Sequence, residues 1–208
     1  MFYETARPHG LRANPLNAIV VPRPIGWIST VDGAGRANLA PYSFFNAVAY
    51  RPPQVMFSAT GAHDHGGGLK DSIANIRETA EFVVNLATWA LREAMNASSV
   101  PAPSGVDEFE QAGLERAPAR LVRPPLVAAS PVHLECVLSQ IVELEAPAPE
   151  KPNTMVIGRV VGIHIADAVL VDGLIDIALL DPIARLGYDR YTRVRESFAM
   201  TRPRWEGT

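Results

Sequence analysis

Polar and aromatic side chains gather after a turn near the N-terminus, where they could bind a ligand. An apolar run from Ile25 to Val31 ends at the turn Asp32-Gly33-Ala34-Gly35, and a return strand is expected from Arg36 to Ala40. Because proline lacks a ladder donor, Pro41 is expected to stop this strand and to free Tyr42 to Asn46 from regular pairing. We therefore expect this elbow to direct hydroxyl, amide and backbone N–H groups at a ligand.

A second candidate binding segment is Lys70-Asp71-Ser72, which follows a glycine-rich loop. The start of a helix presents unpaired N–H groups and a dipole that favours anions, and the charge of Lys70 and the hydroxyl of Ser72 would add to both. Asp71 would repel an anion, so we expect it to cap the helix or to orient a neighbour. Simple capping is the alternative explanation for all three residues.

Two further groups allow more than one interpretation. His63-Asp64-His65 brings two imidazoles and a carboxylate together, but no further ligand is identifiable elsewhere in the sequence. A solvated loop or a substrate contact is therefore favoured over a metal site. The basic and aromatic residues from 185 to 195 have two interpretations. They form a solvated helix face, or one of their arginines contacts a phosphate. The sequence contains no GxGxxG motif, Walker loop or Gly-x-Ser-x-Gly elbow. We expect no catalytic side-chain nucleophile.

The elements that must position these residues are mainly strands. Alternating residues predict a strand over 133–144 with one wet face, and a run that is apolar on both faces predicts a strand over 154–165 that a helix or a second subunit covers. Few helices and no βαβ alternation favour an antiparallel barrel. Further strands are expected at 54–60, 81–87 and 168–171, and helices at 70–79, 88–97 and 107–112.

Composition narrows the classes of protein. The 208 residues are 48% hydrophobic, which suffices for one domain over residues 1–208. The net charge of −3 comes without a basic tract, which disfavours nucleic acid as a partner. Cys136 is the only cysteine, as expected in a reducing cytoplasm. The N-terminus has no basic region followed by an apolar core, and charges interrupt the later apolar runs, so neither secretion nor a membrane span is expected.

Taken in order, several segments resemble the landmarks of the flavin reductase-like family. As a set these landmarks are fairly specific, whereas each one alone is weak. They are Arg23-Pro24-Ile25 through Ser29-Thr30, Asn38 to Asn46, Arg51-Pro52-Pro53, Lys70-Asp71-Ser72 with Asn75-Ile76, Phe82 to Asn85, and Ala184 to Tyr191.

The resemblance implies an FMN-binding split β-barrel with Greek-key connections, assembled as a homodimer with FMN near the interface. NAD(P)H would pass a hydride to flavin N5, and reduced flavin would serve a partner monooxygenase or stay bound. The alternative is an FMN-binding electron carrier or flavin-holding module without reductase turnover. Position by position, the residues expected to bind the cofactor are Trp27, Ser29, Thr30, Ala40, Pro41, Tyr42, Ser43, Asn46, Lys70, Asp71, Ser72, Arg185 and Tyr188.

For the aromatic and hydroxyl residues of this set, core packing is the alternative explanation. Trp27 and Tyr42 offer flat faces to a planar ring, but most aromatic side chains are buried in a core. Lys70 to Ser72 would approach the phosphate. A single glycine at position 187 and a long loop from Gly61 to Gly68 depart from the family pattern, on the side where the nicotinamide would approach.

Overall fold

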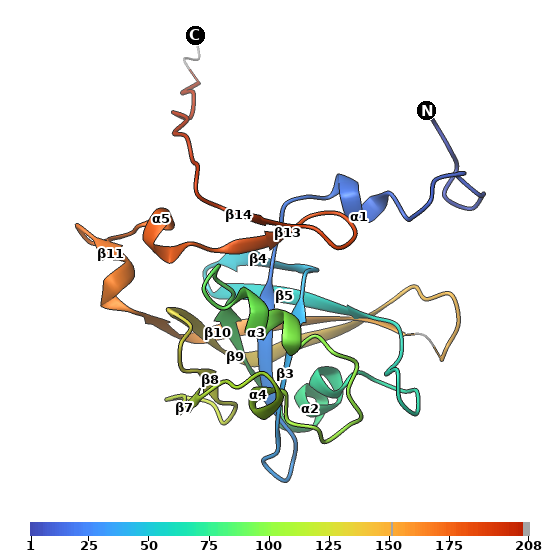
Figure 1. Cartoon of the computed structure of the whole chain (residues 1–208), viewed down its shortest axis with the longest axis horizontal. Coiled ribbons are helices and arrows are strands. Elements are labelled where there is room, and N and C mark those ends of the chain that lie inside the picture. The colour runs from blue at the N-terminus through green and yellow to red at the C-terminus, as the bar shows by residue number, and fades with distance from the viewer. Residues whose placement is uncertain (151, 206–208) are drawn as a thin grey trace.

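The fold centres on a strongly curved antiparallel sheet of seven strands in the order β3-β2-β6-β9-β10-β5-β4 (Figure 1). The computed structural model describes residues 1–150 and 152–205. The strands of this sheet are β2 (Gly26–Val31), β3 (Ala37–Tyr42), β4 (Phe45–Tyr50), β5 (Pro53–Thr60), β6 (Glu81–Leu86), β9 (Val132–Leu144) and β10 (Asn153–Ile165). The expected antiparallel β architecture is confirmed.

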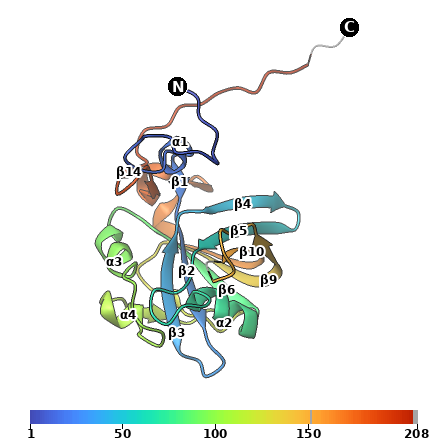
Figure 2. The same cartoon turned by 90° about the vertical axis from the view of Figure 1, so that its right-hand side faces the viewer.

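Smaller elements close the ends of the large sheet (Figures 1 and 2). A three-stranded sheet joins the two ends of the chain, because β1 (Arg23–Pro24) pairs with β13 (Ile183–Arg185), which pairs with β14 (Tyr191–Arg193). The remaining elements are α1 (Leu16–Ile19), α2 (Asp71–Thr79), α3 (Arg92–Ala97), α4 (Glu108–Gln111), α5 (Ile177–Leu180), the 3₁₀ helix η1 (Asp167–Val169), and the strand pairs β7 (Arg116–Ala117) with β8 (Leu126–Val127) and β11 (Leu170–Val171) with β12 (Leu174–Ile175).

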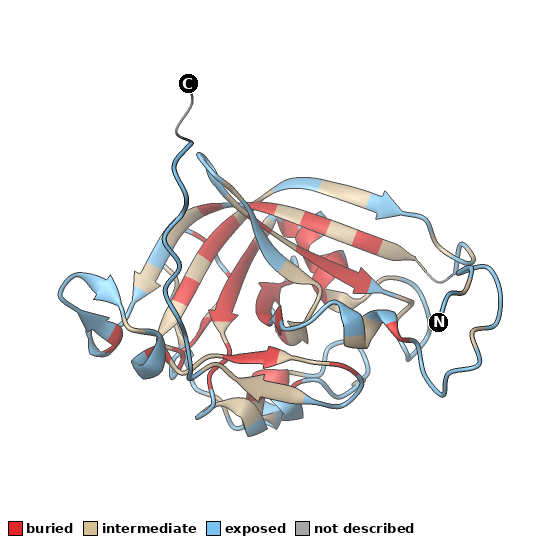
Figure 3. Cartoon of the chain, turned by 90° about the horizontal axis from the view of Figure 1, so that it is seen from above, coloured by how far each residue is buried: buried red, intermediate tan, exposed pale blue. Residues whose placement is uncertain are grey.

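The largest buried cluster lies between the curved sheet and α2 (Figure 3). Ile73 and Ile76 point from one face of α2 onto Phe57 and Phe82, whose rings meet edge to face at 5.6 Å. Gly158 on β10 lies directly beneath Phe82, since a Cβ there would be 2.3 Å from the Cζ atom of that ring. This contact fixes α2, and with it the start of the helix, against the barrel.

Several expected elements differ in detail. Residues 88–97 form a shorter helix, because Thr88 bridges Pro182 and α3 begins only at Arg92. Residues 168–171 divide between η1 and β11. The cap expected from Asp71 or Ser72 is wrong, since Lys70 is the N-cap of α2 and no side chain caps it. The basic segment expected as a solvated helix face is a strand, a loop and a second strand.

The expectation that Pro41 ends its strand is also wrong. Strand β3 continues through Pro41, which pairs with Trp27, to Tyr42, and pairing resumes at Phe45. Leu39, two residues earlier, turns its N–H away from β2 toward Glu108 at 2.9 Å. Because alternate residues of a strand face the same way, Pro41 occupies an outward position where no ladder bond is lost.

The outer face of β10 remains partly uncovered in the single chain, although the sequence predicts cover on both faces. Thr154, Val156 and Val160 are buried, whereas Ile163 is 57% exposed. Among the described residues, no helix is long and apolar enough to cross a membrane.

Candidate functional site

A cleft opens along the outer edge of β3, where the start of α2 and residues 98–102 meet it. Strand β3 is the last strand of the large sheet, so alternate backbone groups face the cleft instead of a neighbouring strand. Its wall includes Ala40, Pro41 and Tyr42, and continues to His63 and Lys70. An edge strand with free backbone groups can bond the polar rim of a flat ligand.

A buried hydrogen-bond network forms the floor of this cleft. The Glu108 Oε2 atom accepts bonds from the Asn38 Nδ2 atom at 3.0 Å and the Leu39 amide at 2.9 Å. The Asn38 Oδ1 atom in turn accepts from the Ser72 hydroxyl at 2.8 Å. The pKa of Glu108 is raised, mainly by burial and to a lesser degree by the charge of Asp71. The network ties α4, β3 and α2 together, so it fixes the shape of the cleft.

Tyr42 connects this floor with the core. Its ring packs on Phe57 with 4.8 Å between centroids, and its hydroxyl reaches Ser72. Burial raises the pKa of Tyr42 to about 12, so the hydroxyl keeps its proton at neutral pH and can donate a hydrogen bond.

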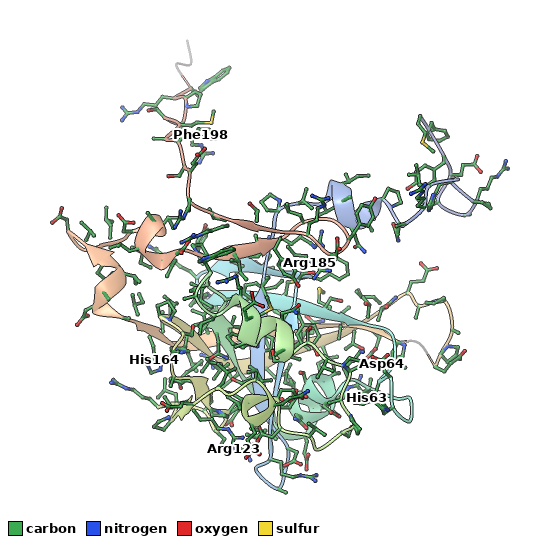
Figure 4. The ribbon with its side chains drawn as sticks, in the orientation of Figure 1. His63, Asp64, Arg123, His164, Arg185 and Phe198 are labelled. Carbon is green, nitrogen blue, oxygen red and sulfur yellow. The ribbon has the colours of Figure 1, made fainter. Side chains whose placement is uncertain are left out.

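The loop of residues 61–69 and the loop that follows α3 are joined over the cleft (Figure 4). The Asp71 carboxylate accepts a 2.6 Å bond from the Ser104 hydroxyl and lies 3.4 Å from the His63 Nε2 atom, while His65 contacts the carbonyl of Pro101 at 2.8 Å. These contacts therefore hold the two loops together. Within the described residues, no group of three His, Cys, Asp or Glu side chains is arranged to hold a metal ion.

A second hollow continues from the first past Pro41, Tyr42 and Lys70, which line both. It contains two arginines that lie opposite each other in neighbouring strands, Arg23 in β1 and Arg185 in β13. Like charges in directly opposed positions of a sheet repel each other. The pKa of Arg23 is lowered accordingly, mainly by burial and further by the charge of Arg185.

The two arginines donate their hydrogen bonds to carbonyl and hydroxyl oxygens of the described residues. Arg23 donates to the carbonyl oxygens of Asn17 at 2.8 Å, Val20 at 2.5 Å and Leu186 at 3.2 Å. Arg185 donates to the Tyr188 carbonyl and the Tyr191 hydroxyl. Among the described residues, neither guanidinium forms an ion pair with a carboxylate. The second hollow is therefore suited to an anion such as a phosphate.

Ten of the thirteen expected cofactor-binding residues border one of three hollows. Six of them line the first hollow. Ser43, Arg185 and Tyr188 line the second hollow, which Lys70 also borders. Asn46 lies farther along, in a shallow hollow beside β4 and β5. The six in the first hollow are Ala40, Pro41, Tyr42, Lys70, Asp71 and Ser72.

The expectation is wrong for the three residues on β2. Trp27, Ser29 and Thr30 have no exposed surface, so no ligand can touch them in this structure. The Trp27 Nε1 atom donates to the Ser98 hydroxyl at 2.9 Å, and Ser29 donates to the carbonyl of Pro125 at 2.6 Å. The core explanation therefore holds for them, because β2 is a central strand covered on both faces.

The sequence did not identify three residues that the structure places at the site. Asn38 and Arg23 belong to recognisable segments, but nothing in the local pattern marks them as wall residues. Glu108 lies in a short acidic segment, and the sequence does not show which of its carboxylates reaches the site. Arg23 is marked as a site residue only by its pairing with Arg185, which lies 162 positions later in the chain.

Comparison with known proteins identifies the class. Residues 19–179 match the model of the family described as flavin reductase like domain. The chain thus belongs to the flavin reductase-like family, whose members are flavin-binding proteins with oxidoreductase functions.

Three similar proteins extend this result. An uncharacterised protein of Halalkalibacterium halodurans is 37% identical over 184 residues, which cover 88% of this chain and 87% of that protein. The structure of nitrilotriacetate monooxygenase component B from Bacillus cereus is 30% identical, with a TM-score of 0.83 over 93% of this chain and 100% of that one. A Shewanella frigidimarina protein with a split barrel domain has a TM-score of 0.81 at 22% identity, over 98% and 100% of the two chains. The fold of this chain is accordingly the split barrel.

Proposed function

We propose that this protein is an NAD(P)H-dependent FMN oxidoreductase in which the flavin lies across the two hollows. The observation that carries the proposal is the pair Arg23 and Arg185, opposed in neighbouring strands beside Lys70 and without carboxylate partners among the described residues. A phosphate placed between the two arginines would remove their mutual repulsion. Lys70, which lies 3.7 Å from the Asp64 carboxylate, would add a third positive charge. The first hollow holds the carboxylates of Asp71 and Glu108, so we place the phosphate in the second hollow and not at the start of α2.

The remaining residues fit a flat polar ring. Pro41 and Tyr42 line both hollows and connect the phosphate position with the edge of β3. The outward backbone groups of β3 and the first amides of α2 would supply donors and acceptors to the ring edge. If bound there, FMN would supply the chemistry of hydride acceptance at N5 and of electron transfer to an acceptor. The protein would bind and orient the two reactants and limit access of water.

A homodimer and a partner monooxygenase form part of the proposal. The exposed face of β10, with Ile163 at 57% and Ile165 at 39%, supports burial against a second copy. The name of the Bacillus cereus relative, a monooxygenase component, supports delivery of reduced flavin to an oxygenase. The dimer is tested by sedimentation equilibrium.

Rapid mixing tests the enzymatic proposal. Protein reconstituted with FMN is mixed anaerobically with NADH or NADPH while the flavin absorbance is followed. Loss of the flavin absorbance at least as fast as steady-state turnover supports the reductase, and the faster of the two nicotinamides is the preferred donor. Stable FMN binding with no bleaching by either nicotinamide would replace the reductase with an electron carrier or flavin-holding module. Parallel titration with FAD decides between the two flavins.

A further inference from the structure

The C-terminal segment, residues 195–205, is exposed along its whole length. Its last anchors are the bond from the Val194 amide to the Pro182 carbonyl at 2.9 Å and an ion pair between Arg195 and Asp181 at 3.9 Å. Every residue from 195 to 205 is exposed, and the segment runs away from the barrel (Figures 2 and 4).

The composition of this segment is that of a docking peptide. Phe198, Met200 and Trp205 are 84%, 83% and 92% exposed, which is unusual for side chains of their size. Arg195, Arg202 and Arg204 outnumber the carboxylates Glu196 and Glu206, so residues 195–208 carry a net charge of +1 (three positive, two negative). Large apolar groups interleaved with arginines are typical of the centre of an interface.

A surface of opposite character lies on the strand pair β11–β12 and its flanks, residues 163–180, called here the acidic flap. Its exposed apolar residues include Leu174 at 73%, Ile163 at 57% and Leu179 at 54%. The flap has three carboxylates and no lysine or arginine. Among the described residues none of the three, Asp167, Asp172 and Asp176, forms an ion pair, although the last caps α5.

We propose that the C-terminal segment of one copy of this chain docks on the acidic flap of a second copy. The two surfaces are opposite in charge, +1 for residues 195–208 against −3 for the flap, and both expose apolar side chains. Because each chain carries both surfaces, two copies can exchange segments reciprocally, which is a closed twofold arrangement. An extended segment from 195 to 205 spans about 33 Å, enough to cross a face of a neighbouring domain of this size. The contact rests on the proposed homodimer, whose buried face shares Ile163 and Ile165 with the flap, and it is independent of flavin and of the proposed reaction.

Single cysteines test the contact directly. The variants Ala199→Cys in the segment and Ala168→Cys in the flap change small exposed residues, and the native Cys136 is buried. The two proteins are mixed at equal concentration, oxidised mildly and separated without reductant. We expect a mixed disulfide that joins one segment variant to one flap variant, distinguished from disulfides between like variants by an affinity tag on one of the two proteins. As the matched control, Ala34→Cys, in the exposed turn between β2 and β3, replaces the flap variant and is expected to give about tenfold less product.

Charge reversal separates specific docking from chance collision. Arg204→Asp in the segment variant is expected to reduce the rate of cross-linking about tenfold, and Asp167→Arg in the flap variant is expected to restore part of it. The double variant Ala168→Cys/Ala199→Cys distinguishes docking in trans from docking in cis. A product of single-chain mass whose two introduced thiols are both lost would show that the segment folds onto its own chain and would overturn the proposal. Equal yields from the flap and control variants would also overturn it.

Discussion

Replacing Arg185 by methionine tests the phosphate position in the second hollow. Methionine keeps the unbranched apolar stem of the side chain but removes the guanidinium group and its charge. A hydrogen bond between charged groups contributes about 1.5–3 kcal/mol, so the dissociation constant of FMN should rise roughly 10- to 150-fold. The ligand-free protein should lose much less stability, because Arg185 directly opposes Arg23 and their repulsion disappears with the substitution.

Two measurements separate these effects. FMN affinity is measured by quenching of flavin fluorescence, and the free energy of unfolding by urea titration without flavin. Arg159→Met is the control, because it removes an equal charge from an exposed position on β10 outside both hollows. Its FMN affinity should match that of the wild type. An unchanged FMN affinity in Arg185→Met, or an equal loss in both variants, would refute the assignment of the phosphate to the arginine pair.

Three further predictions concern the structure around the site. Ser98→Ala leaves the buried Trp27 indole N–H without its 2.9 Å partner and should lower the free energy of unfolding by about 1–3 kcal/mol in urea titration. Gly158→Ala places a methyl group 2.3 Å from the Phe82 ring and should cost about 1–3 kcal/mol in the same assay. Glu108→Gln should gain stability relative to wild type as the pH rises from about 4 to 7, because burial raises the folded-state pKa of that carboxyl and its ionisation on raising the pH costs wild-type stability.

Each of these predictions has a matched control. Ser99→Ala removes an exposed hydroxyl that bonds only the carbonyl of Asn96, so its effect should stay within about 0.5 kcal/mol. Gly162→Ala meets the side chain of Leu121, which is 62% exposed and free to move, and should cost much less than Gly158→Ala. For Glu108, parallel stability curves of variant and wild type across this pH range would contradict the stated sign.

The strands of the barrel could be predicted from the sequence because their alternation is local. The segment that forms β9 alternates polar and apolar residues, and the segment that forms β10 is a run that is apolar on both faces, so each is recognised without reference to the rest of the chain. The helix start at Lys70 likewise follows from the residues around it. The continuation of β3 through Pro41 could not be predicted. A proline is tolerated only where its missing N–H would face away from the neighbouring strand, and this depends on which side of β3 has no neighbour.

The site could be predicted only where side chains face outward from an edge. Ala40 to Ser43 and Lys70 to Ser72 line the two hollows, whereas Trp27, Ser29 and Thr30 lie on a strand that is covered on both faces. A strand buried on both faces has no local pattern that shows which residues reach a ligand. The arginine pair depends on the register of β1 against β13, a contact between the two ends of the chain. Such long-range register is absent from any local window of sequence.

Calorimetric titration of the purified protein with FMN tests the central claim most directly. The cleft along β3 and the three cations beside it predict saturable binding of one FMN per chain. They also predict that riboflavin, which has the same ring without the phosphate, binds at least tenfold more weakly. Absence of FMN binding, or equal affinity for FMN and riboflavin, would contradict the account.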